Sequence, residues 1–149
     1  MTIYEQLRWQ DEIESAHKAL LSISEERSLS VFREGGWSRK EILGHLIDSA
    51  LNNHQRFVRA ALDGRYVGPT YAQTAWVNIH GYSSMSWASV LEHWRFQNQL
   101  LAEVVKRLPE DRLEARCVVG TNPVVSLRFL LEDYLQHMGH HLRQILSTT

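Results

Sequence analysis

The sequence has 149 residues, of which 44% are hydrophobic and 22% charged, and its formal net charge at pH 7 is −1. These values are typical of a water-soluble globular protein with enough apolar residues for one core. They do not show the clustered basic excess of nucleic-acid-binding proteins, and no apolar run approaches the roughly 20 residues of a membrane-spanning helix. We therefore expect one cytoplasmic domain over residues 1–149, with neither a nucleic-acid nor a membrane partner.

Four amphipathic segments follow one another along the chain. The spacing of their apolar residues predicts helices over residues 2–22, 38–62, 84–109 and 126–146. The second helix has the clearest start, because Ser38 suits the N-cap position and Glu41 stands three residues later. No segment shows a convincing strand pattern, so the expected fold class is all-α, a four-helix bundle.

The longest connector between these helices covers residues 64–83 and is rich in aromatic side chains. Irregular loops of about twenty residues are uncommon in small domains and are usually functional or mobile. The aromatic content favours an ordered loop that packs over another part of the protein. Trp76 and Tyr82 are candidates for the wall of a substrate pocket, and packing against helix ends is the alternative role.

Three of the eight histidines lie within residues 137–141. In a helix His137 and His141 are one turn apart on the same face, where two imidazoles can bind one metal ion. Both border the apolar face, whereas His140 points further towards solvent and is left out. Asp133, one turn before His137, could accept the second ring N–H of a ligating histidine.

A zinc site needs at least three protein ligands, so a further ligand must come from another part of the chain. The candidate is His45, which lies at the edge of the apolar face of the 38–62 helix. Three neutral imidazoles favour a divalent transition metal over Mg or Ca, and we expect Zn or Ni. The alternative is that these histidines are hydrogen-bonded packing residues, because the HxxxH spacing alone is a weak motif.

A polar strip continues from His45 along the same predicted helix. Asn52, Asn53 and Arg56 belong to this strip and could orient a polar or anionic substrate. The alternative is that the strip is only the solvated edge of an amphipathic helix.

Several other reactive side chains are not assigned to the site. His54 lies on the opposite side of the helix from His45, so we expect a structural role. The single cysteine, Cys117, has no candidate base near it in the sequence and is expected to be a packing residue. His80 and His93 remain possible additional ligands.

Three segments together carry a resemblance to a known family: residues 37–50 (WSRKEILGHLIDSA), 133–137 (DYLQH) and 141–145 (HLRQI). They resemble the DinB/YfiT-like superfamily of metalloenzymes, and the resemblance extends over nearly the whole chain. It implies an up-down-down-up four-helix bundle with metal ligands at His45, His137 and His141. Members of that superfamily include transferases that depend on bacillithiol or mycothiol, an isomerase and hydrolase-like proteins.

Two functions of different classes follow as expectations. The first is a metal-dependent enzyme acting on a small molecule, either a transferase that uses a low-molecular-weight thiol or a hydrolase, with its catalytic residues unknown. The second is a non-catalytic bundle, with or without metal, that serves as a stress-related interaction module. A homodimer is expected in either case, and Trp9 and Trp94 are candidates for its surface.

Overall fold

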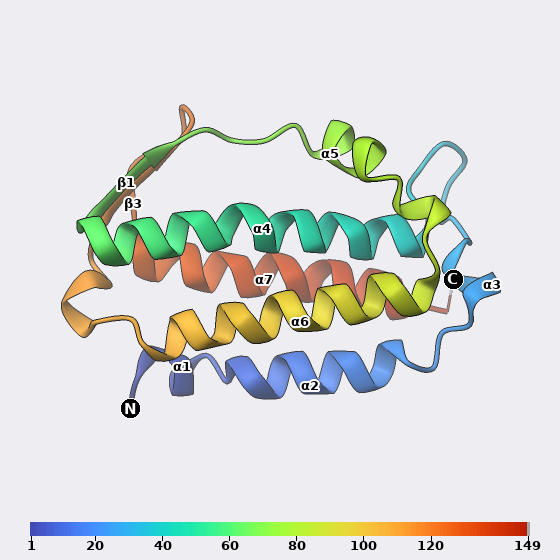
Figure 1. Ribbon diagram of the computed structural model, residues 1–149, viewed down its shortest axis with the longest axis horizontal. Coiled ribbons are helices and arrows are strands. Elements are labelled where there is room, and N and C mark those ends of the chain that lie inside the picture. The colour runs from blue at the N-terminus through green and yellow to red at the C-terminus, as the bar shows by residue number, and fades with distance from the viewer. Residues whose placement is uncertain (149) are drawn as a thin grey trace.

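The computed structural model describes residues 1–148. Its helices are α1 (Ile3–Gln6), α2 (Trp9–Leu20), α3 (Glu25–Ser28), α4 (Arg39–Asp63), α5 (Gln73–His80), α6 (Trp87–Lys106) and α7 (Leu127–Leu146). The four long helices α2, α4, α6 and α7 lie side by side, with α2 and α7 running in one direction and α4 and α6 in the other (Figure 1). This arrangement confirms the expected up-down-down-up four-helix bundle.

The ends of α4 are set by the local sequence. The Ser38 side chain accepts a hydrogen bond from the Glu41 N–H, and the Glu41 side chain accepts one from the Ser38 N–H. This capping box satisfies two of the N–H groups that a helix start leaves without partners. At the other end Gly64 adopts a left-handed conformation with φ 75°, which a glycine reaches without strain. The predicted start at Ser38 is therefore confirmed.

The N-terminal helix is interrupted, contrary to the single helix expected over residues 2–22. Arg8 has a positive φ of 51° and separates α1 from α2. The break directly precedes Trp9, which is fully buried and stacks on Tyr134 of α7 with ring centroids 5.4 Å apart. Burial of so large an aromatic surface compensates for the strained backbone at Arg8.

Both tryptophans that the sequence suggested for a dimer surface are core residues. Trp9 and Trp94 have no exposed surface. The expectation that either one marks an interface is therefore wrong. A helical pattern shows where the apolar residues lie, but it does not show whether the core of the same chain or a second subunit buries a given residue.

A small sheet joins the two long connectors, contrary to the expectation of a strand-free fold. Its strands are β1 (Arg65–Gly68), β2 (Arg116–Val119) and β3 (Val125–Ser126). Strand β2 lies in the middle, parallel to β1 and antiparallel to β3, with Tyr66 opposite Cys117. The pairing brings connectors that are distant in the sequence to one end of the bundle (Figure 1).

The 64–83 connector is ordered rather than irregular. It contains β1, the helix α5 and the short 3-10 turn η1 (Tyr82–Ser84), and another such turn, η2 (Glu110–Arg112), follows α6. The connector runs back along α4 and places α5 over that helix (Figure 1). Within residues 1–148, no helix has the combination of length and apolarity that crossing a membrane requires.

Candidate metal centre

The structure brings together the three histidines that the sequence singled out. His45 comes from α4, and His137 and His141 come from α7. One ring nitrogen from each lies within 4.8 Å of the other two. The Nε2 atoms of His45 and His137 are the closest recorded contact, at 3.4 Å.

All three imidazoles are held in the neutral form. His45 is only 1% exposed, and this burial, assisted by His137 and His141, lowers its pKa to about 4. Burial also lowers the pKa values of His137 and His141. Near neutral pH each ring therefore has a free lone pair, which is the form that binds a metal.

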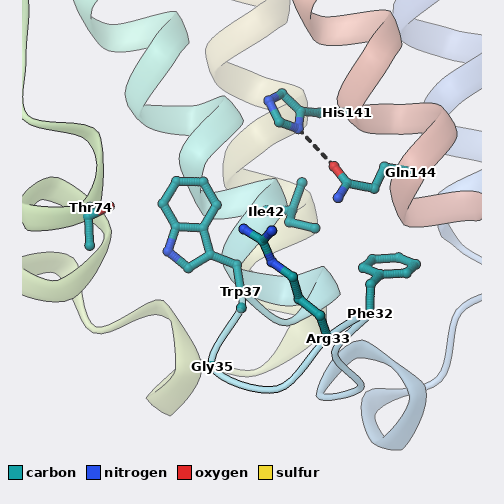
Figure 2. Close-up of a pocket in the computed structure, with 9 residues that line it drawn as sticks. Phe32, Arg33, Gly35, Trp37, Ile42, Thr74, His141 and Gln144 are labelled. Carbon is teal, nitrogen blue, oxygen red and sulfur yellow. Dashed lines mark hydrogen bonds between the residues drawn. The ribbon is translucent and has the colours of Figure 1, made fainter.

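One ring is oriented by a residue that the sequence interpretation missed. His141 Nδ1 lies 3.0 Å from Gln144 Oε1, as the dashed line in Figure 2 shows. Because an amide oxygen can only accept, His141 Nδ1 carries the proton and Nε2 keeps its lone pair. Side chains three residues apart on one helix are neighbours, so the contact between His141 and Gln144 could have been predicted from the sequence.

Asp133 does not make the contact that the sequence suggested. It is exposed, and within residues 1–148 its side chain makes no hydrogen bond or ion pair. Its negative charge nevertheless favours the protonated form of His137 and partly offsets the lowering of that pKa. The hydrogen-bonded partner in the cluster is Gln144, at His141.

The spacing of two of the three nitrogens suits a divalent transition metal. In a tetrahedral zinc site with Zn–N bonds of about 2.0–2.1 Å, two ligand nitrogens are about 3.3–3.4 Å apart. The separation between His45 Nε2 and His137 Nε2 is 3.4 Å. His45 Nδ1 is sealed from solvent without a hydrogen-bond partner, so the contact of Nε2 with His137 is the one polar contact that offsets the burial of this ring among residues 1–148.

Two cavities adjoin the cluster, and each is lined by one of its histidines. The Trp37 cavity, of about 550 Å³, is lined by Phe32, Arg33, Gly35, Gly36, Trp37, Ile42, Thr74, His141 and Gln144 (Figure 2). The Arg56 cavity, of about 450 Å³, is lined by Ser49, Asn53, Arg56, Tyr71, Gln73, Val119, Asn122, Pro123, Val125, Phe129, Leu130, Asp133, Tyr134 and His137. Both volumes lie within the range of about 300–1,000 Å³ that is common for small-molecule sites.

The residues predicted to contact substrate divide into two groups. Asn53 and Arg56 line the Arg56 cavity. Asn52 donates to the Asp48 carbonyl of its own helix and lines neither cavity beside the cluster. The Tyr82 hydroxyl donates to buried Asp48 Oδ1 at 2.7 Å, and its ring lines a different, smaller pocket.

Trp76 also lies outside both cavities. Its ring contacts Tyr71 and His80, with centroid distances of 5.4 and 5.7 Å. Tyr71 lines the Arg56 cavity, so Trp76 supports that wall from behind. Trp76 is half-buried, and its ring contacts are to Tyr71 and His80 rather than to the end of a bundle helix, which was the alternative role.

Three further histidines, His54, His80 and His93, and the cysteine are not part of the cluster. His80 Nδ1 lies 2.8 Å from Asp48 Oδ1, and His93 lines the same small pocket as His80. His54 Nδ1 is 3.4 Å from Gln97 Nε2. Cys117 is a buried free thiol whose pKa is raised by burial, which confirms the expected packing role.

Comparison with protein families gives a match to one model, described as the DinB superfamily, over residues 5–145. The chain belongs to the DinB superfamily. A relative from Oceanobacillus iheyensis, provisionally named a metal-dependent hydrolase, is 26% identical over 124 residues, which cover 83% of this chain and 71% of the relative. A relative from Halalkalibacterium halodurans with the same provisional name is 23% identical over 135 residues, covering 87% and 75%.

Solved structures share this DinB-type bundle. YfiT from Bacillus subtilis, described as a probable metal-dependent hydrolase with an unusual four-helix bundle topology, superposes with a TM-score of 0.80 at 19% identity, covering 93% of this chain and 82% of YfiT. A mycothiol-dependent maleylpyruvate isomerase has a TM-score of 0.80 at 13% identity, covering all of this chain and 62% of the isomerase. At these identities the likeness establishes the fold.

Proposed function

We propose that this protein is a metal-dependent enzyme acting on a small molecule, with a divalent ion, Zn or Ni, bound by His45, His137 and His141. The observation that carries the proposal is the convergence of three neutral imidazoles within 4.8 Å of one another, next to two cavities. The provisional names of the two bacterial relatives support a metal-dependent reaction.

The protein supplies a fixed and water-poor setting for the ion. Gln144 holds the His141 ring with its Nε2 lone pair free, and the burial of His45 excludes solvent from one side of the cluster. A bound divalent ion would lower the pKa of a water molecule or a thiol and so supply a nucleophile at neutral pH. Water as nucleophile corresponds to hydrolysis, and a low-molecular-weight thiol corresponds to transfer.

The two cavities favour a reaction of two substrates. His141 lines the Trp37 cavity and His137 lines the Arg56 cavity, so two molecules could reach the cluster from different directions. Thiol-dependent transfer needs such an arrangement, because the thiol and the electrophile must both approach the ion. The mycothiol-dependent isomerase of the same fold supports this choice.

The metal site is tested with protein purified without an affinity tag. We expect near-stoichiometric zinc or nickel in the wild type by elemental analysis, and its loss in His137→Ala. His93→Ala is the control, because His93 is an exposed histidine on another helix, α6, and lies outside the cluster. A wild-type protein that holds no metal and whose melting temperature does not rise with added zinc or nickel would contradict the proposal.

Transfer and hydrolysis are distinguished by the dependence on thiol. Metal-loaded protein is incubated with the electrophile monochlorobimane together with one thiol at a time. The thiols are cysteine, glutathione, bacillithiol and mycothiol. Transfer predicts faster conjugation with at least one thiol, and no acceleration when His137→Ala is used. Rates equal to the uncatalysed rate with every thiol would count against transfer.

We further propose that the protein is a cytoplasmic homodimer. Because Trp9 and Trp94 are buried, a dimer surface must involve other residues. Phe96 and Leu100, 58% and 56% exposed, lie one turn apart on α6 and are suitable candidates. Sedimentation equilibrium should show a dimer that Phe96→Glu dissociates, and a wild-type monomer at micromolar concentration would refute this part of the proposal.

A further inference from the structure

Arg56 is a buried cation without an acidic partner. Its residue surface is only 9% exposed, yet within residues 1–148 it makes no ion pair. Its hydrogen bonds are long, with Nη1 3.5 Å from Asn53 Oδ1 and Nη2 3.3 Å from the Pro69 carbonyl. Burying a charge is costly unless an opposite charge or strong hydrogen bonds compensate for it.

The unused donors of Arg56 are accessible to a ligand. A guanidinium has five N–H donors, of which two are occupied here. Arg56 Nε has no hydrogen-bond partner and is not among the sealed, unpartnered polar atoms of residues 1–148, so this donor is open to a ligand. The Arg56 cavity, which Arg56 lines, has His137 on its wall.

The surroundings of Arg56 define the kind of molecule that fits. Tyr71 supplies a further polar group, and burial raises the pKa of Tyr71, which therefore remains a donor. Asn53 Nδ2 donates to Ser49 and its Oδ1 accepts from Arg56, so Asn53 holds the guanidinium in place. The lining also includes four apolar residues, Val119, Val125, Phe129 and Leu130, which we call the apolar wall. The cavity thus combines a cationic group, a neutral donor and an apolar surface.

The cavity also contains one acidic residue, Asp133. It is exposed, whereas Arg56 is buried, and the two do not form an ion pair. The positive charge is therefore not neutralised inside the cavity. The negative charge of Asp133 lies at its solvent-exposed side.

We propose that Arg56 anchors a carboxylate-binding subsite, which selects small substrates carrying a carboxylate next to a short apolar group. The guanidinium fork matches a carboxylate with two parallel hydrogen bonds, and such charge-assisted pairs are among the stronger interactions in proteins. With the carboxylate at Arg56, the remainder of the molecule extends along the apolar wall towards His137. The role of His137 rests on the proposed metal function, whereas the carboxylate subsite does not require the metal.

The subsite is tested by calorimetry with metal-free protein at pH 7.5, so that a carboxylate cannot bind an ion. The probes are phenylacetate, its neutral analogue phenylacetamide, and inorganic phosphate. We expect phenylacetate to bind about tenfold or more tightly than phenylacetamide, the factor that one charge-assisted pair contributes. Equal affinities in the wild type, or tighter binding of phosphate than of phenylacetate, would overturn the proposal.

Three variants locate the effect. Arg56→Met should abolish the preference for phenylacetate, and Asp133→Asn should strengthen phenylacetate binding several-fold by removing a like charge. Arg33→Met is the matched control, because it removes an exposed arginine from the Trp37 cavity and should leave the preference unchanged. A folded Arg56→Met that retains the preference refutes the proposal. If Arg56→Met does not fold, the wild-type comparison and Asp133→Asn still decide it.

The result is independent of the metal proposal. Zinc binding is measured on the same wild-type protein and on Arg56→Met. Stoichiometric zinc without a preference for phenylacetate would refute the subsite and leave the metal centre intact. A preference for phenylacetate in a protein that does not bind zinc would refute the metal centre and leave the subsite intact.

Discussion

Gln144 accepts a hydrogen bond from His141, with Oε1 and Nδ1 3.0 Å apart on the last turns of α7. The bond selects the tautomer of the His141 ring and fixes the direction of its Nε2 lone pair. Among residues 1–148, the rings of His45 and His137 have no such hydrogen bond to a side chain outside the three histidines.

Replacing Gln144 by leucine should therefore weaken zinc binding by about ten- to a hundredfold, the usual effect of losing such a partner. Competition with a chromophoric chelator measures the affinity. Gln136→Leu provides the control, because Gln136 is exposed on the same helix and makes no side-chain hydrogen bond among residues 1–148. Equal zinc affinities of the two variants would show that Gln144 does not support the site.

Gly44→Ala should destabilise the protein by about 1–3 kcal/mol, although alanine favours a helix more than glycine does. A Cβ at position 44 would lie 2.2 Å from the Tyr82 ring, which cannot withdraw because its hydroxyl bonds to Asp48. Urea unfolding of metal-free protein gives the free energy of unfolding.

Gly139→Ala is the matched control for this substitution. Its Cβ would meet only the end of the flexible Arg143 side chain, at 3.3 Å. It should therefore be neutral or stabilising by about 0.5–1 kcal/mol. Similar free energies of unfolding for both alanine variants would contradict the role of Gly44 as the seat of the Tyr82 ring.

Tyr82→Phe should lower stability by about 1–3 kcal/mol without changing the KM for substrate. The variant removes a donor from Asp48, whose other oxygen, Oδ2, is already buried without a partner. Tyr4→Phe, which loses only a 3.4 Å hydrogen bond at a partly exposed site, should cost less than about 0.5 kcal/mol. A rise in KM at unchanged stability would instead place Tyr82 in contact with substrate.

The metal-free protein should lose stability as the pH falls from about 6.5 to 4. The pKa of His45 is about 4 in the folded protein and near its ordinary value of 6.5 in the unfolded chain. The unfolded state therefore binds a proton first, so the stabilisation is complete above pH 6.5 and disappears as the pH approaches 4. The contribution is about 3 kcal/mol.

Carboxyl groups also titrate in this range, so the comparison uses His45→Leu. Urea unfolding of the metal-free wild type and of this variant between pH 4 and 7 isolates the histidine contribution. The difference in the free energy of unfolding between the two proteins should shrink or change sign as the pH falls. A constant difference would contradict the lowered pKa of His45.

Local sequence signals predicted most of the bundle. Ser38 and Glu41 satisfy the start of α4 with each other, so the helix start depends on neighbours in the sequence. The pairing of Tyr66 with Cys117 depends on connectors that meet only in the folded chain, and no periodic pattern reports it. The left-handed conformation of Arg8 was not predicted either, because the residue after it, Trp9, is buried by tertiary packing that the helical pattern does not report.

The histidine cluster was predictable from the apolar faces of two helices. His45 lies at the edge of one apolar face, and His137 and His141 lie at the edge of another, so packing these faces brings the rings together. The cavities were not predictable, since they are formed by loop residues such as Trp37 and Asn122 and by α5, which crosses over α4. Their shapes depend on tertiary packing that spacing along one helix does not contain.

Gln73 and Thr74 are consecutive residues at the start of α5, yet Gln73 lines the Arg56 cavity and Thr74 lines the Trp37 cavity. The first turn of α5 thus contributes to the walls of both cavities. A shift of this turn, caused for instance by an insertion in residues 69–72, should therefore change the volumes of both cavities together. Related proteins with altered segments here should differ in the volumes of both cavities, and protein engineers can adjust both volumes through one short stretch of chain.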